Sequence, residues 1–178
     1  MQYLYYALLT VVCWGTYGIC MHEGSVGMKN PDHGRIMAFL WVGIAYFLTA
    51  VVAPIVILKM NNVPLAFPTK GWVWSLVAGT LGAIGALGVL LAFGSAAAEK
   101  PTPPGWFVPV IMSIIFAGAP MVNAIVSTTK EGSWARVLSK EHWPFILGIA
   151  MAALGGYLIT KYAPKPLKSP PSESASKA

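Results

Sequence analysis

The chain has 178 residues, of which 56% are hydrophobic and 10% are charged, whereas about 25% of the residues in a soluble domain carry a charge. This composition excludes an ordinary soluble globular domain. The formal net charge of +6 is also typical of nucleic-acid-binding proteins. Here the basic residues are confined to short loops and a tail, which favours a role beside lipid headgroups, and we expect no nucleic-acid partner.

Five charge-free runs indicate five membrane-spanning helices. Each run is 19 residues or longer, and about 20 apolar residues suffice to cross a bilayer as a helix. No run has the continuous polar face that a helix on a soluble core requires. The predicted fold class is therefore an all-α integral membrane protein, a bundle of five transmembrane helices forming one domain over residues 1–162. The runs cover residues 1–22, 36–58, 71–98, 101–129 and 142–160.

The first predicted helix covers residues 3–21. It lacks the basic segment and the cleavage site of a signal peptide, so we expect it to be retained as a membrane helix. A loop with an Asn-Pro-Asp turn leads to the second helix, residues 36–58, which has Pro54 near its end. The third helix, residues 72–98, is rich in small side chains.

A Pro-rich segment breaks the chain after the third helix, because proline removes a backbone donor and fixes φ. The fourth predicted helix covers residues 106–128, and an amphipathic linker separates it from the fifth, residues 144–162. Residues 163–178 consist mainly of Pro, Ser and Lys. This composition cannot bury enough apolar surface to order itself, and it predicts a disordered tail.

The Lys and Arg residues divide almost evenly between the two sides of the predicted membrane. Five spans place the termini on opposite sides, and an excess of basic residues normally marks the cytoplasmic side. Five basic residues fall on the amino-terminal side, namely Lys59, Lys70, Lys130, Arg136 and Lys140. Seven fall on the carboxy-terminal side, namely Lys29, Arg35, Lys100, Lys161, Lys165, Lys168 and Lys177. This small difference predicts either insertion in both orientations or an orientation set by a partner or by the amino terminus.

Small residues recur every fourth position in the third and fifth helices, a pattern that allows helix backbones to approach closely. Two interpretations remain open, namely close packing inside one bundle and close packing at a dimer interface. The predicted packing glycines are Gly79, Gly82, Gly85, Gly155 and Gly156.

Polar residues and prolines collect on one face of the fourth helix. They follow spacings of three and four residues, which place them on one side of a helix. Asn123 carries the only amide deep within the last four helices, and an amide in a membrane is expensive unless it is paired. The face is either a helix contact with two proline kinks or the lining of a substrate path. Its members are Pro109, Ser113, Phe116, Pro120, Asn123 and Ser127.

Aromatic and hydroxyl side chains form a second stripe in the first helix, where Trp14 and Tyr17 lie on one face and Thr16 lies beside them. Such residues line cavities for polar solutes, and they are equally common in ordinary helix packing. Cys13 and Cys20 lie seven residues apart in the same helix. A single helix cannot bridge them, so we interpret them as small packing residues.

We expect neither a metal site nor enzymatic activity. His22, Glu23, Asp32 and His33 have suitable ligand atoms, but their spacing matches no zinc signature. No nucleophile motif, phosphate-binding loop or buried carboxylate pair is present in the sequence, and no cofactor is implied. The predicted spans contain no Asp or Glu, which disfavours proton-coupled export of cations.

The order of several short motifs resembles one repeat of the EamA domain, in the drug/metabolite transporter superfamily. Trp14-Gly15-Thr16-Tyr17-Gly18 is similar to the opening of that domain, and residues 85–127 are similar to its third and fourth helices. The run ILGIAMAALGGYLIT resembles the Gly-rich fifth helix. The similarity covers residues 4–162 and suggests a short, single-repeat bacterial form.

This resemblance implies a multi-pass protein of the bacterial inner (cell) membrane that transports a small-molecule substrate by alternating access. Two repeats of this type, inverted relative to each other, usually enclose one path. A single repeat therefore implies a homodimer, and the antiparallel homodimer is the arrangement that reproduces the inverted pair. We expect Trp14, Thr16, Tyr17, Ser113 and Asn123 to line the path, with kinks at Pro109 and Pro120. The alternative is a non-transporting membrane scaffold or a small subunit of a larger membrane complex.

Overall fold

The computed structural model describes residues 2–98 and 106–164, and this part of the chain is helical without any strand. The elements are α1 (Gln2–Gly27), α2 (Gly34–Phe47), η1 (Leu48–Val52), α3 (Ala53–Met60), α4 (Thr69–Ala98), α5 (Phe107–Glu131), α6 (Trp134–Val137) and α7 (Trp143–Lys161). The chain divides into two compact units, residues 1–95 and 96–178, and each is described by itself.

Five helices in the described residues are long and apolar enough to cross a membrane, which confirms the all-helical class and the number of candidate spans. They are α1, the continuous helix from Gly34 to Met60, α4, α5 and α7. The shortest has 19 residues, a length of about 28 Å at 1.5 Å per residue. That length matches a bilayer hydrocarbon core of about 30 Å.

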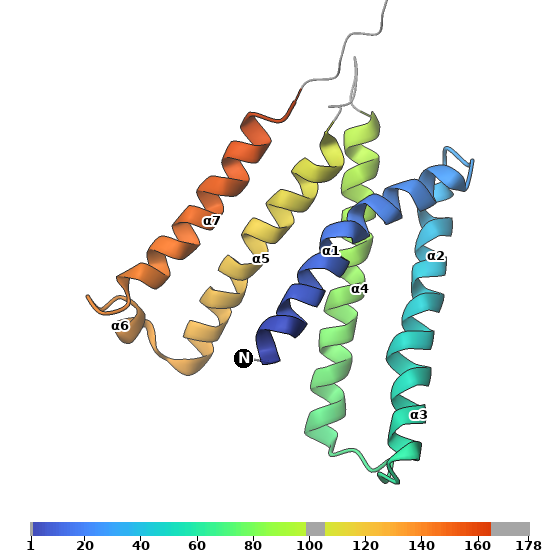
Figure 1. The fold of residues 1–178 in the computed structure, drawn as a ribbon, viewed down its shortest axis with the longest axis horizontal. Coiled ribbons are helices and arrows are strands. Elements are labelled where there is room, and N and C mark those ends of the chain that lie inside the picture. Colours follow the sequence, from blue (N-terminus) through green and yellow to red (C-terminus); the bar gives the residue numbers. More distant parts are fainter. Residues whose placement is uncertain (1, 99–105, 165–178) are drawn as a thin grey trace, which may run out of the picture. The chain divides into compact units, whose positions relative to one another are not determined.

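The first unit begins with a hairpin of α1 and α2 (Figure 1). Lys29 has a positive φ of 51° and turns the chain after α1. The Asn30 Oδ1 atom then accepts hydrogen bonds from the N–H groups of Asp32 (3.1 Å) and His33 (2.9 Å), an Asx turn that leads into α2. Gly34 is required where the helices meet, because a Cβ atom there would lie 2.8 Å from the Ser25 carbonyl oxygen.

A π-helical turn, η1, interrupts the second candidate span. The Ala53 N–H group donates to the Leu48 carbonyl oxygen, five residues back, and Pro54 follows immediately. Proline cannot donate to a carbonyl one turn earlier, and a single π turn absorbs this defect without ending the helix. The helix then continues as α3, and a short loop connects it to α4 (Figure 1).

The second unit is an antiparallel pair, α5 and α7, with the short helix α6 between them in the chain (Figure 1). Gly132, with a positive φ of 62°, ends α5. Pro144 lies in the first turn of α7, where its missing N–H group is tolerated. The two long helices come into close contact at Gly156, where a Cβ atom would lie 2.7 Å from the Cβ atom of Ala117.

The helix bounds differ from the predicted ones mainly in the first helix and in the linker. The first helix was predicted to end at residue 21, but α1 continues to Gly27, because Gly24 weakens a helix without stopping it and the first true turn comes at Lys29 and Asn30. Part of the predicted linker folds as α6. The predicted disordered tail falls outside the described residues, apart from residues 163–164.

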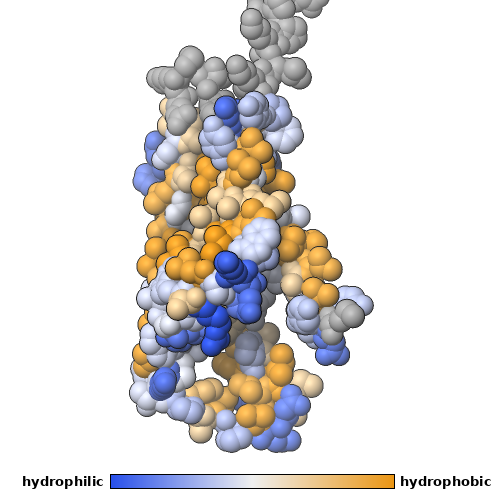
Figure 2. Space-filling model, turned by 90° about the vertical axis from the view of Figure 1, so that its left-hand side faces the viewer, coloured by the Kyte–Doolittle hydropathy of each residue, from blue (hydrophilic) through white to orange (hydrophobic). Residues whose placement is uncertain are grey.

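Apolar side chains are exposed along all five long helices, and Figure 2 shows them over a large part of the surface that faces the viewer, with hydrophilic side chains gathered in patches. The buried residues of α4 form one stripe along the helix, in which successive members are separated by three residues or by one. They are Ala86, Val89, Leu90, Phe93 and Gly94. Exposed apolar area of this extent needs a lipid or protein environment.

Candidate functional site

Two aromatic rings of the predicted α1 stripe are in contact. The ring centroids of Trp14 and Tyr17 lie 5.6 Å apart with an interplanar angle of 43°, within the range that favours aromatic pairs. Trp14 is 41% exposed, whereas Tyr17 is half-buried. The pair therefore forms a partly covered aromatic surface on α1.

The Tyr17 hydroxyl group is buried, and it has no hydrogen-bond partner within bonding distance among the described residues. It interacts electrostatically with Tyr46 of α2, so two phenol groups face each other across the α1–α2 hairpin. A buried polar group without a partner is uncommon in proteins. Tyr46 was not among the residues predicted for the path, because nothing in the sequence aligns α2 with α1.

Thr16 uses its hydroxyl proton within its own helix. The Oγ1 atom lies 2.9 Å from the Val12 carbonyl oxygen and 3.2 Å from that of Cys13. Thr10, Thr80 and Thr160 bond in the same way to the carbonyl four residues earlier, a common arrangement for hydroxyl side chains in helices. Thr16 is exposed, and it can offer a solute only its acceptor lone pairs.

The two prolines of the fourth span have different positions. Pro109 lies in the first turn of α5, where a helix needs no N–H donor and proline favours helix initiation. Pro120 is the proline inside α5, and it cannot donate to the carbonyl oxygen of Phe116. Only Pro120 is placed where a kink can arise, so Pro109 marks the beginning of the helix.

Ser113 lies at the contact between α5 and α7. Its carbonyl oxygen is 3.7 Å from the position of a Cβ atom at Gly156, beside the closer contact with Ala117. Ser113 itself is half-buried. The Ser113 carbonyl oxygen alone would tolerate a side chain at Gly156, whereas the 2.7 Å distance to the Ala117 Cβ atom favours a residue without one.

Asn123 lies on α5 away from the contact between Ala117 and α7. It follows Ala117 by six residues, which corresponds to a rotation of about 120° away from the α7 contact at 3.6 residues per turn. Its side chain is exposed and makes no hydrogen bond in the described part of the chain. The amide therefore projects from the α5–α7 pair with both its donor and its acceptor capacity unused.

Four of the five predicted packing glycines have open space around them. A Cβ atom at Gly79, Gly82, Gly85 or Gly155 would meet nothing within 4 Å, in contrast to Gly156. The role of these four in helix packing or in a dimer interface stays a prediction.

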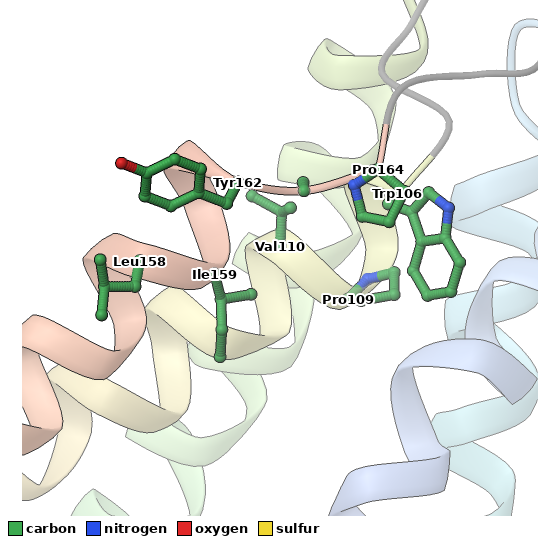
Figure 3. A pocket seen from close by; sticks show the side chains of 8 residues that line it. Trp106, Pro109, Val110, Leu158, Ile159, Tyr162 and Pro164 are labelled. Atoms are coloured by element: carbon green, nitrogen blue, oxygen red, sulfur yellow. The ribbon is translucent and has the colours of Figure 1, made fainter.

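Apolar grooves lie along the described part of the α5–α7 pair. One, of about 490 Å³, lies where α5 begins and α7 ends (Figure 3), and another, of about 350 Å³, lies along the middle of the pair. Of the predicted residues, Pro109 lines the first groove and Gly156 lines the second. The first is lined by Trp106, Pro109, Val110, Leu158, Ile159, Tyr162, Ala163 and Pro164. Such walls suit acyl chains or apolar side chains better than a polar solute.

The structure thus brings together Trp14 and Tyr17 on one helix and keeps Ser113 and Asn123 on another, where the ten residues between them correspond to a rotation of about 80°. A path lined by both sets would involve both units, and it stays a prediction. Within the described residues, no three His, Cys, Asp or Glu side chains come close enough to hold a metal ion. Sequence reasoning also missed the position of Arg35, which lies against α4 at Gly94.

No protein-family model matches this chain, and no curated protein or solved structure gives a significant match.

Proposed function

We propose that this protein is a multi-pass membrane transporter for a small neutral or zwitterionic molecule, and that it works as a dimer by alternating access. The observation that carries the proposal is Asn123, an amide without a hydrogen bond, exposed on an apolar helix. In a bilayer such a group needs a partner or water. A water-filled path bounded by a second copy of the chain supplies both.

Two further features support transport over a purely structural role. Tyr17 and Tyr46 place hydroxyl groups side by side in a helix pair, and Pro120 lies near the middle of α5 between Ser113 and Asn123. Proline inside a membrane helix creates a point at which the two halves can bend, and the freed backbone groups are tolerated where they line a cavity.

The family resemblance favours the EamA-like class, and the inverted arrangement of its repeats favours an antiparallel homodimer. An odd number of spans and nearly balanced basic residues on the two sides fit insertion in both orientations. The alternative, a scaffold or small subunit, would use the same exposed amide to bind a partner helix. The two proposals differ in whether purified protein moves a solute by itself.

The test is solute release from proteoliposomes that contain only the purified protein. The vesicles are loaded with a defined mixture of amino acids, nucleosides and sugars, and the contents are measured over time by mass spectrometry. The matched variant is Asn123→Leu, which keeps the approximate size of the side chain and removes its polar groups. Val122→Leu, at an exposed neighbouring position, is the control.

We expect at least one solute of the mixture to leave wild-type vesicles faster than protein-free vesicles. The Asn123→Leu variant should lose this release and still assemble like the wild type on a sizing column, while Val122→Leu retains it. Release of none of the solutes, together with copurification of a second protein from mild detergent, would favour the scaffold. Unchanged release by Asn123→Leu would remove that residue from the path.

A further inference from the structure

A half-buried arginine lies in the first unit, outside the predicted path. Arg35 occupies the first turn of α2, directly after Gly34, which fixes the close approach of α2 to α1. Its side chain extends to α4 and contacts Gly94, a buried position. Three helices of one unit therefore determine where this guanidinium group lies.

The guanidinium group lies flat over Gly94. A Cβ atom at Gly94 would be 2.9 Å from each of the Arg35 atoms Cζ, Nε and Nη1. A point equally distant from these three atoms at that range lies above the plane of the group and not at its edge. The contact with α4 thus occupies one face, and the N–H bonds, which all lie in the plane, point along the helix surface.

The N–H edge of Arg35 has no protein acceptor in the described residues. No hydrogen bond or ion pair joins it to Glu23 or Asp32, the exposed carboxylates that flank the α1–α2 turn. A guanidinium group remains charged at any physiological pH. A half-buried charge of this kind needs an anion or water.

The α4 segment that ends at Gly94 is apolar and buried along one stripe. His22 of α1 stacks edge-on against Phe93, with ring centroids 6.2 Å apart at 88°, and Phe93 precedes Gly94 on α4. Phe93, Leu90 and Met21 are 3%, 0% and 4% exposed. Gly94 is itself buried, so the face of the guanidinium group that lies over it is shielded from water, and such shielding strengthens a charge-assisted hydrogen bond.

We propose that Arg35 is an oxyanion-binding residue that takes a phosphate group, either from an anionic lipid headgroup or from a soluble phosphate compound. A planar fork of N–H donors matches two oxygen atoms of a phosphate. The position fits this ligand, because Arg35 begins one long apolar helix and Gly94 lies near the end of another, where headgroups meet the hydrocarbon core. The proposal does not depend on transport.

The test measures the thermal unfolding midpoint of the full-length protein in nanodiscs of phosphatidylcholine. One arm titrates inorganic phosphate against sodium chloride at matched ionic strength. The other replaces part of the phosphatidylcholine by phosphatidylglycerol. A ligand that binds only the folded state raises the midpoint in proportion to its affinity.

Two variants remove the site in different ways. Arg35→Gln removes the charge, whereas Gly94→Ala keeps it and displaces the guanidinium group, because the added Cβ atom would collide with it. Gly88→Ala is the matched control on the same helix, since a Cβ atom there meets nothing within 4 Å. Should Arg35→Gln fail to fold, Gly94→Ala and Gly88→Ala still decide the question.

We expect wild-type protein and Gly88→Ala to be stabilised in at least one arm, and the affinity of Arg35→Gln and Gly94→Ala to fall about tenfold or more, as for loss of a charge-assisted hydrogen bond. Stabilisation by inorganic phosphate assigns the site to a soluble compound, and stabilisation by phosphatidylglycerol alone assigns it to a headgroup. The proposal is overturned if neither arm stabilises the wild type, or if both variants respond as it does.

Discussion

Individual polar residues in these helices fall into two groups. Most hydroxyl side chains bond to a carbonyl of their own helix, as Thr16 and Thr160 do, so they need nothing outside it. Asn123 and Tyr17 lack such a bond among the described residues. The sequence spacing predicted where these side chains fall on their helices, but it could not show which are satisfied locally, because that depends on rotamers and on the neighbouring helix.

Gly156 lies at a close contact between α5 and α7. We predict that Gly156→Ala destabilises the protein by about 1–3 kcal/mol, as overpacking of a close contact does, because its Cβ atom would lie 2.7 Å from that of Ala117. The measurement is the free energy of unfolding in mixed detergent. Gly148→Ala, on the same helix with open space around it, is the control.

The double variant Ala117→Gly with Gly156→Ala should recover most of this loss, because it moves the methyl group from one helix to the other. Equal stability of Gly156→Ala and Gly148→Ala would contradict the close approach of α5 and α7. So would a double variant whose loss is the sum of the two single losses, since residues in contact should couple.

At the level of whole elements, apolar run length predicted all five long helices, because a bilayer-length helix leaves a strong and simple signal. Their ends were less predictable. The α1–α2 turn depends on the positive φ of Lys29 and the Asn30 side chain, and the π turn depends on how the helix absorbs Pro54. Helix α6 is too short for a periodic pattern.

The end of α5 depends on one backbone conformation. Gly132 has a φ of 62° and its N–H group bonds to the carbonyl oxygen of Thr129 at 3.2 Å, a helix end that favours glycine. We predict that Gly132→Ala lowers the unfolding free energy by about 1 kcal/mol, because a Cβ atom is strained there. Gly132→Asn should lose clearly less, since asparagine tolerates this conformation. Equal losses for both variants would show that side-chain volume, and not backbone conformation, limits this position.

At the level of the whole molecule, five candidate spans form two compact units, and the predicted path draws residues from both. The sequence predicted the all-helical fold class and the stripe of polar residues on α5. The contact of Arg35 with Gly94 and the proximity of Tyr46 to Tyr17 could not be predicted from the sequence, because they depend on how separate helices cross. Five spans also require the termini to lie on opposite sides of a membrane, which ties the dimer proposal to orientation.

The most direct test of an antiparallel dimer is therefore the sidedness of the carboxy terminus. A single cysteine is placed by Lys177→Cys in a background with Cys13→Ser and Cys20→Ser, which removes both native cysteines. Intact cells are treated with a membrane-impermeant thiol reagent, and a second sample is treated after permeabilisation. We predict that part of the protein is labelled in intact cells and the rest only after permeabilisation. A tail confined to one side in every molecule would contradict the antiparallel homodimer.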